Sequence, residues 1–173
     1  MDKKKIFILL GLFWIIIIGG FIGFKEYTLR TGQEVLLKTV PIDPRDLFRG
    51  DYVVLRYDIS TIDSGSVVLE RTDIKLGDRV YVGLGFKERY AFAKNIYLTT
   101  PKDGLYIKGI VKNVSGGRLN VEYGLESYFV PEGRGKEIEN QRGKNVDVEV
   151  SIDRSGNSVI KSLLIDGQVV SFK

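Results

Sequence analysis

One stretch constrains the fold of this chain more than any other: residues 6–24 read IFILLGLFWIIIIGGFIGF, 19 residues without a charge. At ~1.5 Å per helical residue, such a run is about as long as the hydrocarbon core of a bilayer is thick. A cleavable signal peptide has a shorter apolar region, of ~7–15 residues, followed by a small-x-small cleavage site. No such site follows here, and no polar residue interrupts the run as in a soluble core helix. The sequence therefore predicts a transmembrane signal anchor over residues 6–24.

The basic residues near this run give its expected orientation. Lys3, Lys4 and Lys5 precede it, and Lys25, Arg30 and Lys38 follow it. Because the first three are clustered at the N-terminus, as in a signal anchor, we expect the N-terminus to be cytoplasmic. The expected organisation is a cytoplasmic tail (1–5), the single span (6–24), a linker (25–32) and an extracytoplasmic β domain (33–173).

Within the span, Gly19 and Gly23 form a G-x-x-x-G pattern. Small residues at this spacing let two helices approach closely in lipid. The pattern predicts helix-mediated self-association.

Two residue types are missing from the chain, and their absence narrows the chemistry. The sequence has no cysteine and no histidine, which excludes thiol nucleophiles, imidazole bases, disulfides and the usual zinc and haem ligands. No spaced aspartate run of the calcium-loop type occurs either. We therefore expect no metal, no cofactor and no catalytic residue of these classes.

The net charge of +4 is concentrated at the N-terminus. Residues 1–26 hold four lysines against two acidic residues, so the remainder carries 22 basic and 20 acidic residues of the total 26 and 22. Nucleic-acid-binding domains carry a pronounced basic surface. A nearly balanced domain predicts no nucleic-acid partner.

After residue 27 the hydrophobic period changes to two. In VDVEVSID (146–153), valine and isoleucine alternate with polar residues, which is typical of a half-buried strand. The same alternation puts Val80, Val82, Leu84 and Phe86 on one face of another strand. Turn sequences at 115–117, 155–157 and 166–167 separate such runs, as hairpin loops do.

These patterns predict an all-β domain, an antiparallel sandwich or partly open barrel of about nine strands. The expected strands are 33–40, 52–59, 66–71, 78–86, 90–97, 105–114, 118–123, 146–152 and, as a terminal hairpin, 158–171. A short helix is expected only near Gly135 to Gln141.

The stretch GDYVVLRYDI (50–59) combines a turn with a strand. Its alternation sends Val53, Leu55, Tyr57 and Ile59 to a core face. Gly77 and Asp78 repeat the Gly50-Asp51 pair before a second strand, so we interpret the pair as a strand-starting device. The segment VPIDPRDLFR, which precedes Gly50, has no counterpart before Gly77. Its two prolines stiffen a charged loop that can present binding groups.

The run GDYVVLRY matches every fixed position of the pattern that names the GDYXXLXY family of bacterial membrane-anchored proteins, which this chain resembles. The segment VEYGLESYFVPEGRGKEIE (121–139) resembles the second signature of that family. The resemblance implies an N-terminal anchor and an extracytoplasmic β domain, often beside multi-pass membrane proteins. It implies no established reaction.

The second signature combines carboxylates, aromatic rings and an arginine around a glycine-rich bend, a composition suited to a pocket. A strand with one wet face followed by a loop would show the same composition. Across both motifs, the candidate partner- or ligand-binding residues are Asp43, Arg45, Arg49, Tyr52, Glu122, Tyr123, Glu126, Tyr128, Glu132 and Arg134.

Two functions fit these observations. The first is a non-enzymatic, membrane-anchored accessory module that binds a membrane or cell-envelope partner. The alternative is a cell-envelope hydrolase with paired carboxylates, in which Glu126 works with Glu132 or Asp51.

Overall fold

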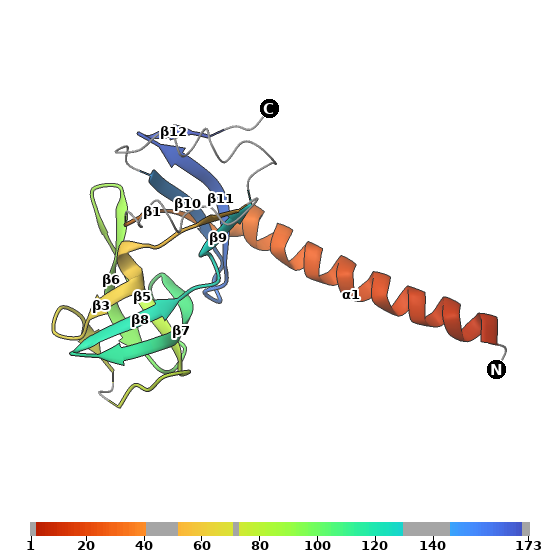
Figure 1. Cartoon of the computed structure of the whole chain (residues 1–173), viewed down its shortest axis with the longest axis horizontal. Coiled ribbons are helices and arrows are strands. Elements are labelled where there is room, and N and C mark those ends of the chain that lie inside the picture. The colour runs from red at the N-terminus through yellow and green to blue at the C-terminus, as the bar shows by residue number, and fades with distance from the viewer. Residues whose placement is uncertain (1–2, 41–51, 71–72, 130–145, 171–173) are drawn as a thin grey trace.

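The computed structural model describes residues 3–40, 52–70, 73–129 and 146–170, and the structural statements below refer to these residues. A long N-terminal helix leads into a β domain (Figure 1). The elements are α1 (Lys3–Thr31), β1 (Gln33–Lys38), β2 (Tyr52–Val54), the 3-10 turn η1 (Asp58–Ser60), β3 (Thr61–Asp63), β4 (Val68–Leu69), β5 (Arg79–Lys87), β6 (Tyr90–Tyr97), β7 (Tyr106–Ser115), β8 (Arg118–Glu122), β9 (Ser127–Phe129), β10 (Val146–Ile152), β11 (Ser158–Ile165) and β12 (Gln168–Val169).

The all-β prediction is confirmed. Nine strands follow the order β12-β11-β10-β1-β6-β5-β7-β8-β3, and β4 pairs with β6 at the side of this path. The sheet is not a closed barrel. Most neighbours are antiparallel, but β1 and β4 each run parallel to β6, so the sheet is mixed. β2 and β9 form a separate two-stranded ribbon.

The helix is long and apolar enough to cross a membrane, and its apolar side chains are exposed. It extends to Thr31, so residues 25–31 of the expected linker are helical. The Gly32 amide donates to the Thr28 carbonyl at 3.0 Å. A Cβ atom at Gly32 would lie 2.7 Å from the Thr28 carbonyl oxygen and 2.9 Å from the Ile152 backbone, so glycine is required for this close approach.

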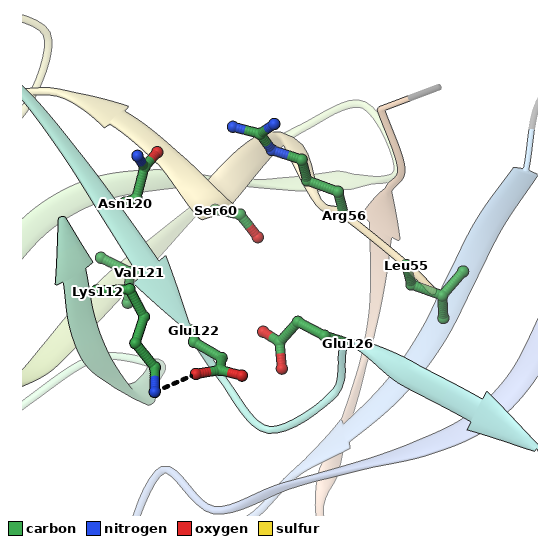
Figure 2. A pocket seen from close by; sticks show the side chains of 8 residues that line it. All are labelled: Leu55, Arg56, Ser60, Lys112, Asn120, Val121, Glu122 and Glu126. Atoms are coloured by element: carbon green, nitrogen blue, oxygen red, sulfur yellow. Dashed lines mark ion pairs between the residues drawn. The ribbon is translucent and has the colours of Figure 1, made fainter. Parts of the chain in front are cut away.

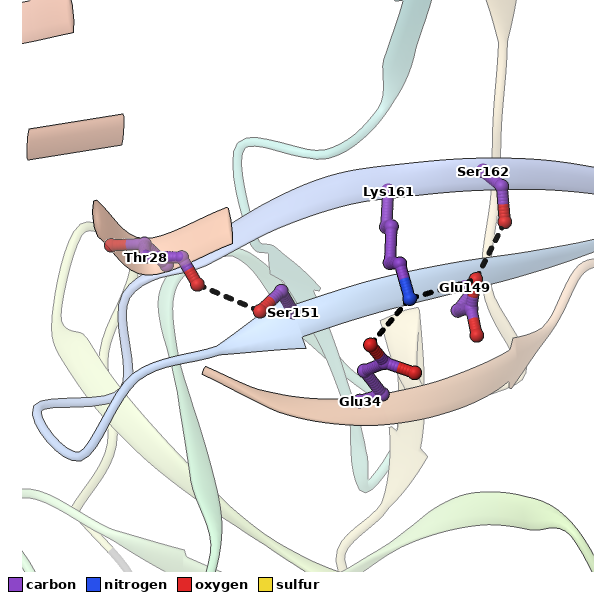
Figure 3. Close-up of polar contacts among 6 residues, drawn as sticks. All are labelled: Thr28, Glu34, Glu149, Ser151, Lys161 and Ser162. Carbon is purple, nitrogen blue, oxygen red and sulfur yellow. Dashed lines mark hydrogen bonds and ion pairs between the residues drawn. The ribbon is translucent and has the colours of Figure 1, made fainter. Parts of the chain in front are cut away.

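We use the term helix seam for the buried contact of Thr28 with Ser151 and Asp153. Thr28 is 0% exposed; its hydroxyl donates to Asp153 Oδ2 at 3.2 Å, and its carbonyl accepts from Ser151 Oγ at 2.7 Å. Figure 3 shows Thr28 beside Ser151 at the end of β10. The seam joins the helix directly to the sheet.

A partly exposed group of polar side chains lies beside the seam, on β1, β10 and β11 (Figure 3). Lys161 Nζ contacts Glu34 Oε1 and lies 3.8 Å from Glu149 Oε2. The hydrogen bond to Glu34 raises the pKa of Lys161, and Ser162 Oγ donates to Glu149 at 2.7 Å. Such cross-strand pairs support the register of the three strands.

The hydrophobic core follows the expected alternation in most strands. Leu37, Val80, Val82, Ile107, Val111, Val148 and Val150 are fully buried, as are Tyr57 and Leu163. Phe86 was expected on the core face of its strand, but it is 49% exposed. It lies next to the end of β5, where the hairpin extends past the core.

Three residues expected on the wet face of 146–153 are buried: Asp147, Ser151 and Asp153, the last of these at the helix seam. Ser151 is covered at the helix seam. Asp147 Oδ2 accepts from the Tyr90 hydroxyl at 2.8 Å, with Arg89 Nη2 at 3.7 Å. The half-buried interpretation of this strand is wrong at these positions because neighbouring elements cover its second face.

Several strand boundaries also differ from the prediction. The strand expected at 52–59 ends at Val54, and the chain then enters the turn η1. The strands β3 and β9 were not predicted as separate elements. Only 68–69 of the strand expected at 66–71 is extended in the described residues. The predicted hairpins at 115–117, 155–157 and 166–167 are confirmed. The helix expected near Gly135 to Gln141 lies outside the described residues.

Candidate functional site

The two sequence signatures pair with each other through their backbones. β2, from the first signature, runs antiparallel to β9, from the second, with Val53 opposite Tyr128. Just beyond the ribbon, the Leu55 amide donates to the Glu126 carbonyl at 2.7 Å. We call this region, residues 52–60 together with 121–129, the signature junction.

Two buried tyrosines hold the signature junction together. The Tyr57 hydroxyl donates to the Leu125 carbonyl at 2.6 Å, and the Tyr123 hydroxyl donates to the Ile59 carbonyl at 2.5 Å. Burial, and secondarily the nearby Glu126 carboxylate, raises the pKa of both phenols. Both therefore stay protonated at physiological pH and act as donors that fix the two segments.

The structural interpretation of the named pattern is confirmed for Leu55 and Tyr57, which are both in the core. Gly50 and Asp51 lie outside the described residues. The second copy of their pair behaves as expected: Gly77 has φ +89°, and Asp78 Oδ2 accepts from the Lys75 amide at 2.8 Å. This pair is a turn that starts β5.

An open pocket of about 280 Å³ lies at the signature junction. Figure 2 shows that its walls come from the segment after β2, from η1, and from β7 and β8 with the turn that follows β8. The lining residues are Leu55, Arg56, Ser60, Lys112, Asn120, Val121, Glu122 and Glu126. The lining combines cationic, anionic and neutral polar side chains with the apolar Leu55 and Val121.

The charges in the pocket are only partly neutralised. Lys112 Nζ lies 2.6 Å from Glu122 Oε2, an ion pair between cross-strand neighbours. Glu126 Oε1 accepts from the Tyr123 amide at 2.6 Å, which fixes the position of the carboxylate. Within the described residues, Glu126 makes no ion pair.

Arg56 is held by a neutral partner. Its Nη2 donates to Thr61 Oγ1 at 2.9 Å, and Thr61 Oγ1 in turn donates to Asn120 Oδ1 at 3.1 Å. No carboxylate of the described residues pairs with the guanidinium. The pocket thus presents one unpaired cation, one unpaired anion, a hydroxyl and an amide. This set can bind a polar or zwitterionic group by hydrogen bonds and charge.

The structure brings part of the predicted site together. Glu122 and Glu126 line the pocket, whereas Tyr123 is buried with its hydroxyl used internally, and Tyr128 is half-buried against the core. Tyr52 begins β2 opposite Phe129. Five candidates lie outside the described residues: Asp43, Arg45, Arg49, Glu132 and Arg134. Glu132 and Asp51, the proposed catalytic partners of Glu126, also lie outside them.

Sequence reasoning did not select Arg56, Ser60, Lys112 and Asn120, which complete the pocket. The alternation in 52–59 indicates that Arg56 is exposed, but nothing in it indicates a pocket. Lys112 and Glu122 become neighbours only through the pairing of β7 with β8, which has a register shift after Val111.

Asp147 is another residue that the sequence did not indicate as notable. It is 2% exposed, and its Oδ1 has no hydrogen-bond partner among the described residues. It lies away from the pocket, between β1 and β11.

Comparison with protein families identifies the family of this chain. The family model of the GDYXXLXY protein matches residues 14–163, most of the helix and nearly all of the β domain. The chain belongs to the GDYXXLXY family. No curated protein and no solved structure matches it. In this member of the GDYXXLXY family, the fixed Leu55 and Tyr57 of the pattern are core residues, and Arg56 between them lines the pocket.

Proposed function

We propose that this chain is a non-enzymatic, membrane-anchored accessory module that binds a membrane or cell-envelope partner at the signature junction. One observation carries the proposal: two sequence signatures far apart in the chain meet at a single pocket. Their aromatic hydroxyls are used to hold the junction, while Arg56 and Glu126 remain open to a partner.

The anchor supports the same proposal. In the bilayer, α1 would place residues 6–24 in the hydrocarbon core, with Lys3, Lys4 and Lys5 on the cytoplasmic side. The β domain would then be extracytoplasmic. Because the helix seam fixes Thr28 to the sheet, the pocket would be held at a constant height above the membrane.

The helix itself can contribute to assembly. Gly19 and Gly23 lie one turn apart on α1, and a Cβ at either would meet nothing within 4 Å. This open stripe fits close pairing with a second helix, either of another copy or of a multi-pass partner.

The test is recovery of crosslinked partners from cell membranes with the full chain as bait. With the double variant Arg56→Ala/Glu126→Gln, we expect the amount of crosslinked partner to fall at least about tenfold, because both unpaired charges are removed. Glu126→Gln keeps an acceptor for the Tyr123 amide, so the junction should stay folded.

A matched control is Arg79→Ala/Glu88→Gln, which removes an arginine and a glutamate charge at exposed positions outside the pocket. It should recover the partner as the unaltered chain does. Equal recovery by both double variants would contradict the proposed binding site, and labelling of the β domain only from the cytoplasmic side would contradict the orientation.

A further inference from the structure

The turn between β10 and β11, residues 153–157, is attached to the end of α1. Asp153 accepts from Thr28 Oγ1, and the same carboxylate accepts from the backbone amides of Ser155 and Asn157, at 2.8 and 2.9 Å, and from Asn157 Nδ2 at 2.8 Å. The Asp153 carboxylate thus holds the turn closed and links it to the helix. Figure 3 shows Thr28 of α1 lying at the end of β10 that leads into this turn.

The position of the turn relative to the bilayer follows from helix geometry. Thr28 lies four residues after Phe24, the last residue of the apolar run, which is ~6 Å along the helix axis. The polar layer of a bilayer extends roughly 5–8 Å beyond the hydrocarbon core on each side. If α1 spans the membrane, as the proposed function requires, the turn lies in the lipid head-group layer.

The side chains at this depth carry mainly positive charge. Arg154 is exposed in the turn, with its backbone carbonyl held by the Tyr106 hydroxyl at 3.1 Å. Lys25 is exposed one helical turn before Thr28 and so lies on the same side of α1. Lys108 Nζ donates to Asn157 Oδ1 at 3.1 Å, which places a third cation at the turn.

Two acidic side chains of the described residues lie at this depth, and both have their oxygens engaged within the protein. Glu26 pairs with Arg30 at 2.6 Å, and Asp153 is buried with four hydrogen bonds. Hydrogen bonding lowers the pKa of Asp153 even though burial acts to raise it. Asp153 stays anionic but is buried, whereas Lys25 and Arg154 are exposed, so the charges that can reach the head groups are mainly those of basic side chains.

We propose that Arg154, Lys25 and Lys108 form a binding surface for the phosphate groups of anionic phospholipids. A basic residue close to an anionic membrane surface contributes an affinity factor of about fivefold. Guanidinium and ammonium groups bind phosphate oxygens by charge-assisted hydrogen bonds. Together with the helix, this surface would fix the orientation of the β domain relative to the membrane.

The first experiment measures depth. Because the chain contains no cysteine, the single variant Ser155→Cys can carry a spin label at the turn of the full-length protein in nanodiscs. The matched control is Ser115→Cys, an exposed serine at the β7–β8 turn, on the side of the domain away from α1 (Figure 1). A nickel chelate attached to lipid head groups should relax the label at 155 and not the label at 115.

The second experiment measures lipid preference. In nanodiscs of phosphatidylcholine mixed with phosphatidylglycerol, spin-labelled phosphatidylglycerol should associate with the protein more strongly than spin-labelled phosphatidylcholine. Arg154→Gln should reduce this preference by about fivefold. Arg118→Gln, at an exposed arginine next to the control turn, should not change it.

Equal relaxation of the two labels, or an unchanged preference in Arg154→Gln, would overturn the proposal. Binding of inorganic phosphate to protein in pure phosphatidylcholine nanodiscs, without any lipid preference, would also overturn it. Failure of the protein to enter nanodiscs at all would instead contradict the membrane anchor on which the proposed function rests.

Discussion

The helix seam and the signature junction both join segments that are distant in sequence, but they use their polar groups differently. At the seam, Thr28, Ser151 and Asp153 satisfy one another, and all three are buried. At the junction, Tyr57 and Tyr123 bond inward to backbone carbonyls, while charged groups line an open pocket. The seam therefore contributes to the fold, whereas the junction retains charged groups for the partner proposed above.

The seam should show the larger loss of stability when broken. Asp153→Asn replaces one of the two carboxylate oxygens, each of which accepts two hydrogen bonds, by a nitrogen that cannot accept, and it removes the charge that strengthens the other two. We expect a cost of about 2–3 kcal/mol in the free energy of unfolding, as for hydrogen bonds to charged groups. Urea unfolding of the full chain in detergent, followed by circular dichroism, measures it.

This loss should depend on pH. The pKa of Asp153 is lower in the folded state than its usual value of ~3.9, so its carboxylate stabilises the fold above that value. The stabilisation disappears as the pH falls through the folded-state pKa. The difference in stability between the unaltered chain and Asp153→Asn should therefore be constant near neutral pH and shrink below about pH 4. A difference that grows on acidification would contradict this assignment.

The junction should show a smaller effect when one phenol is removed. Tyr57→Phe leaves the buried Leu125 carbonyl without its donor, at a cost of about 1–2 kcal/mol. Tyr128→Phe is the control, because Tyr128 is half-buried and its hydroxyl donates to no group among the described residues. The same unfolding experiment should give no change for the control. Equal losses for both variants would show that the Tyr57 hydrogen bond does not hold the junction.

The smallest effect is expected at the other end of β10. Asp147→Asn keeps an acceptor for the Tyr90 hydroxyl and loses only a contact with Arg89, whose side chain is largely exposed. We expect a change within about 1 kcal/mol. A loss as large as that of Asp153→Asn would show that burial of the carboxylate, and not the number of its hydrogen bonds, decides its contribution.

Local patterns in the sequence predicted the elements that depend on local physics. The uncharged run predicted the helix, the alternation of apolar and polar residues predicted most strands, and the Gly-containing turns predicted the hairpins. The core face of 53–59 was also correct, because alternation persists beyond the end of β2 at Val54.

Features that depend on distant neighbours were not predictable. Burial of Ser151 depends on where α1 docks, and burial of Asp147 depends on Tyr90 of β6. Tyr123 belongs to the core because the Ile59 carbonyl lies within reach of its hydroxyl. The pairing of β2 with β9 likewise has no local signal. The pocket was therefore only partly anticipated.

The direct passage from α1 through Gly32 into β1 has a mechanical consequence. Only Gly32 separates the helix from the sheet, and the helix seam adds hydrogen bonds between them, so a tilt of the helix would be passed on to the β domain. If α1 spans a membrane as proposed, the β domain would sample fewer orientations above the bilayer than a flexibly tethered domain, and the proposed partner would have to approach it in a restricted range of orientations.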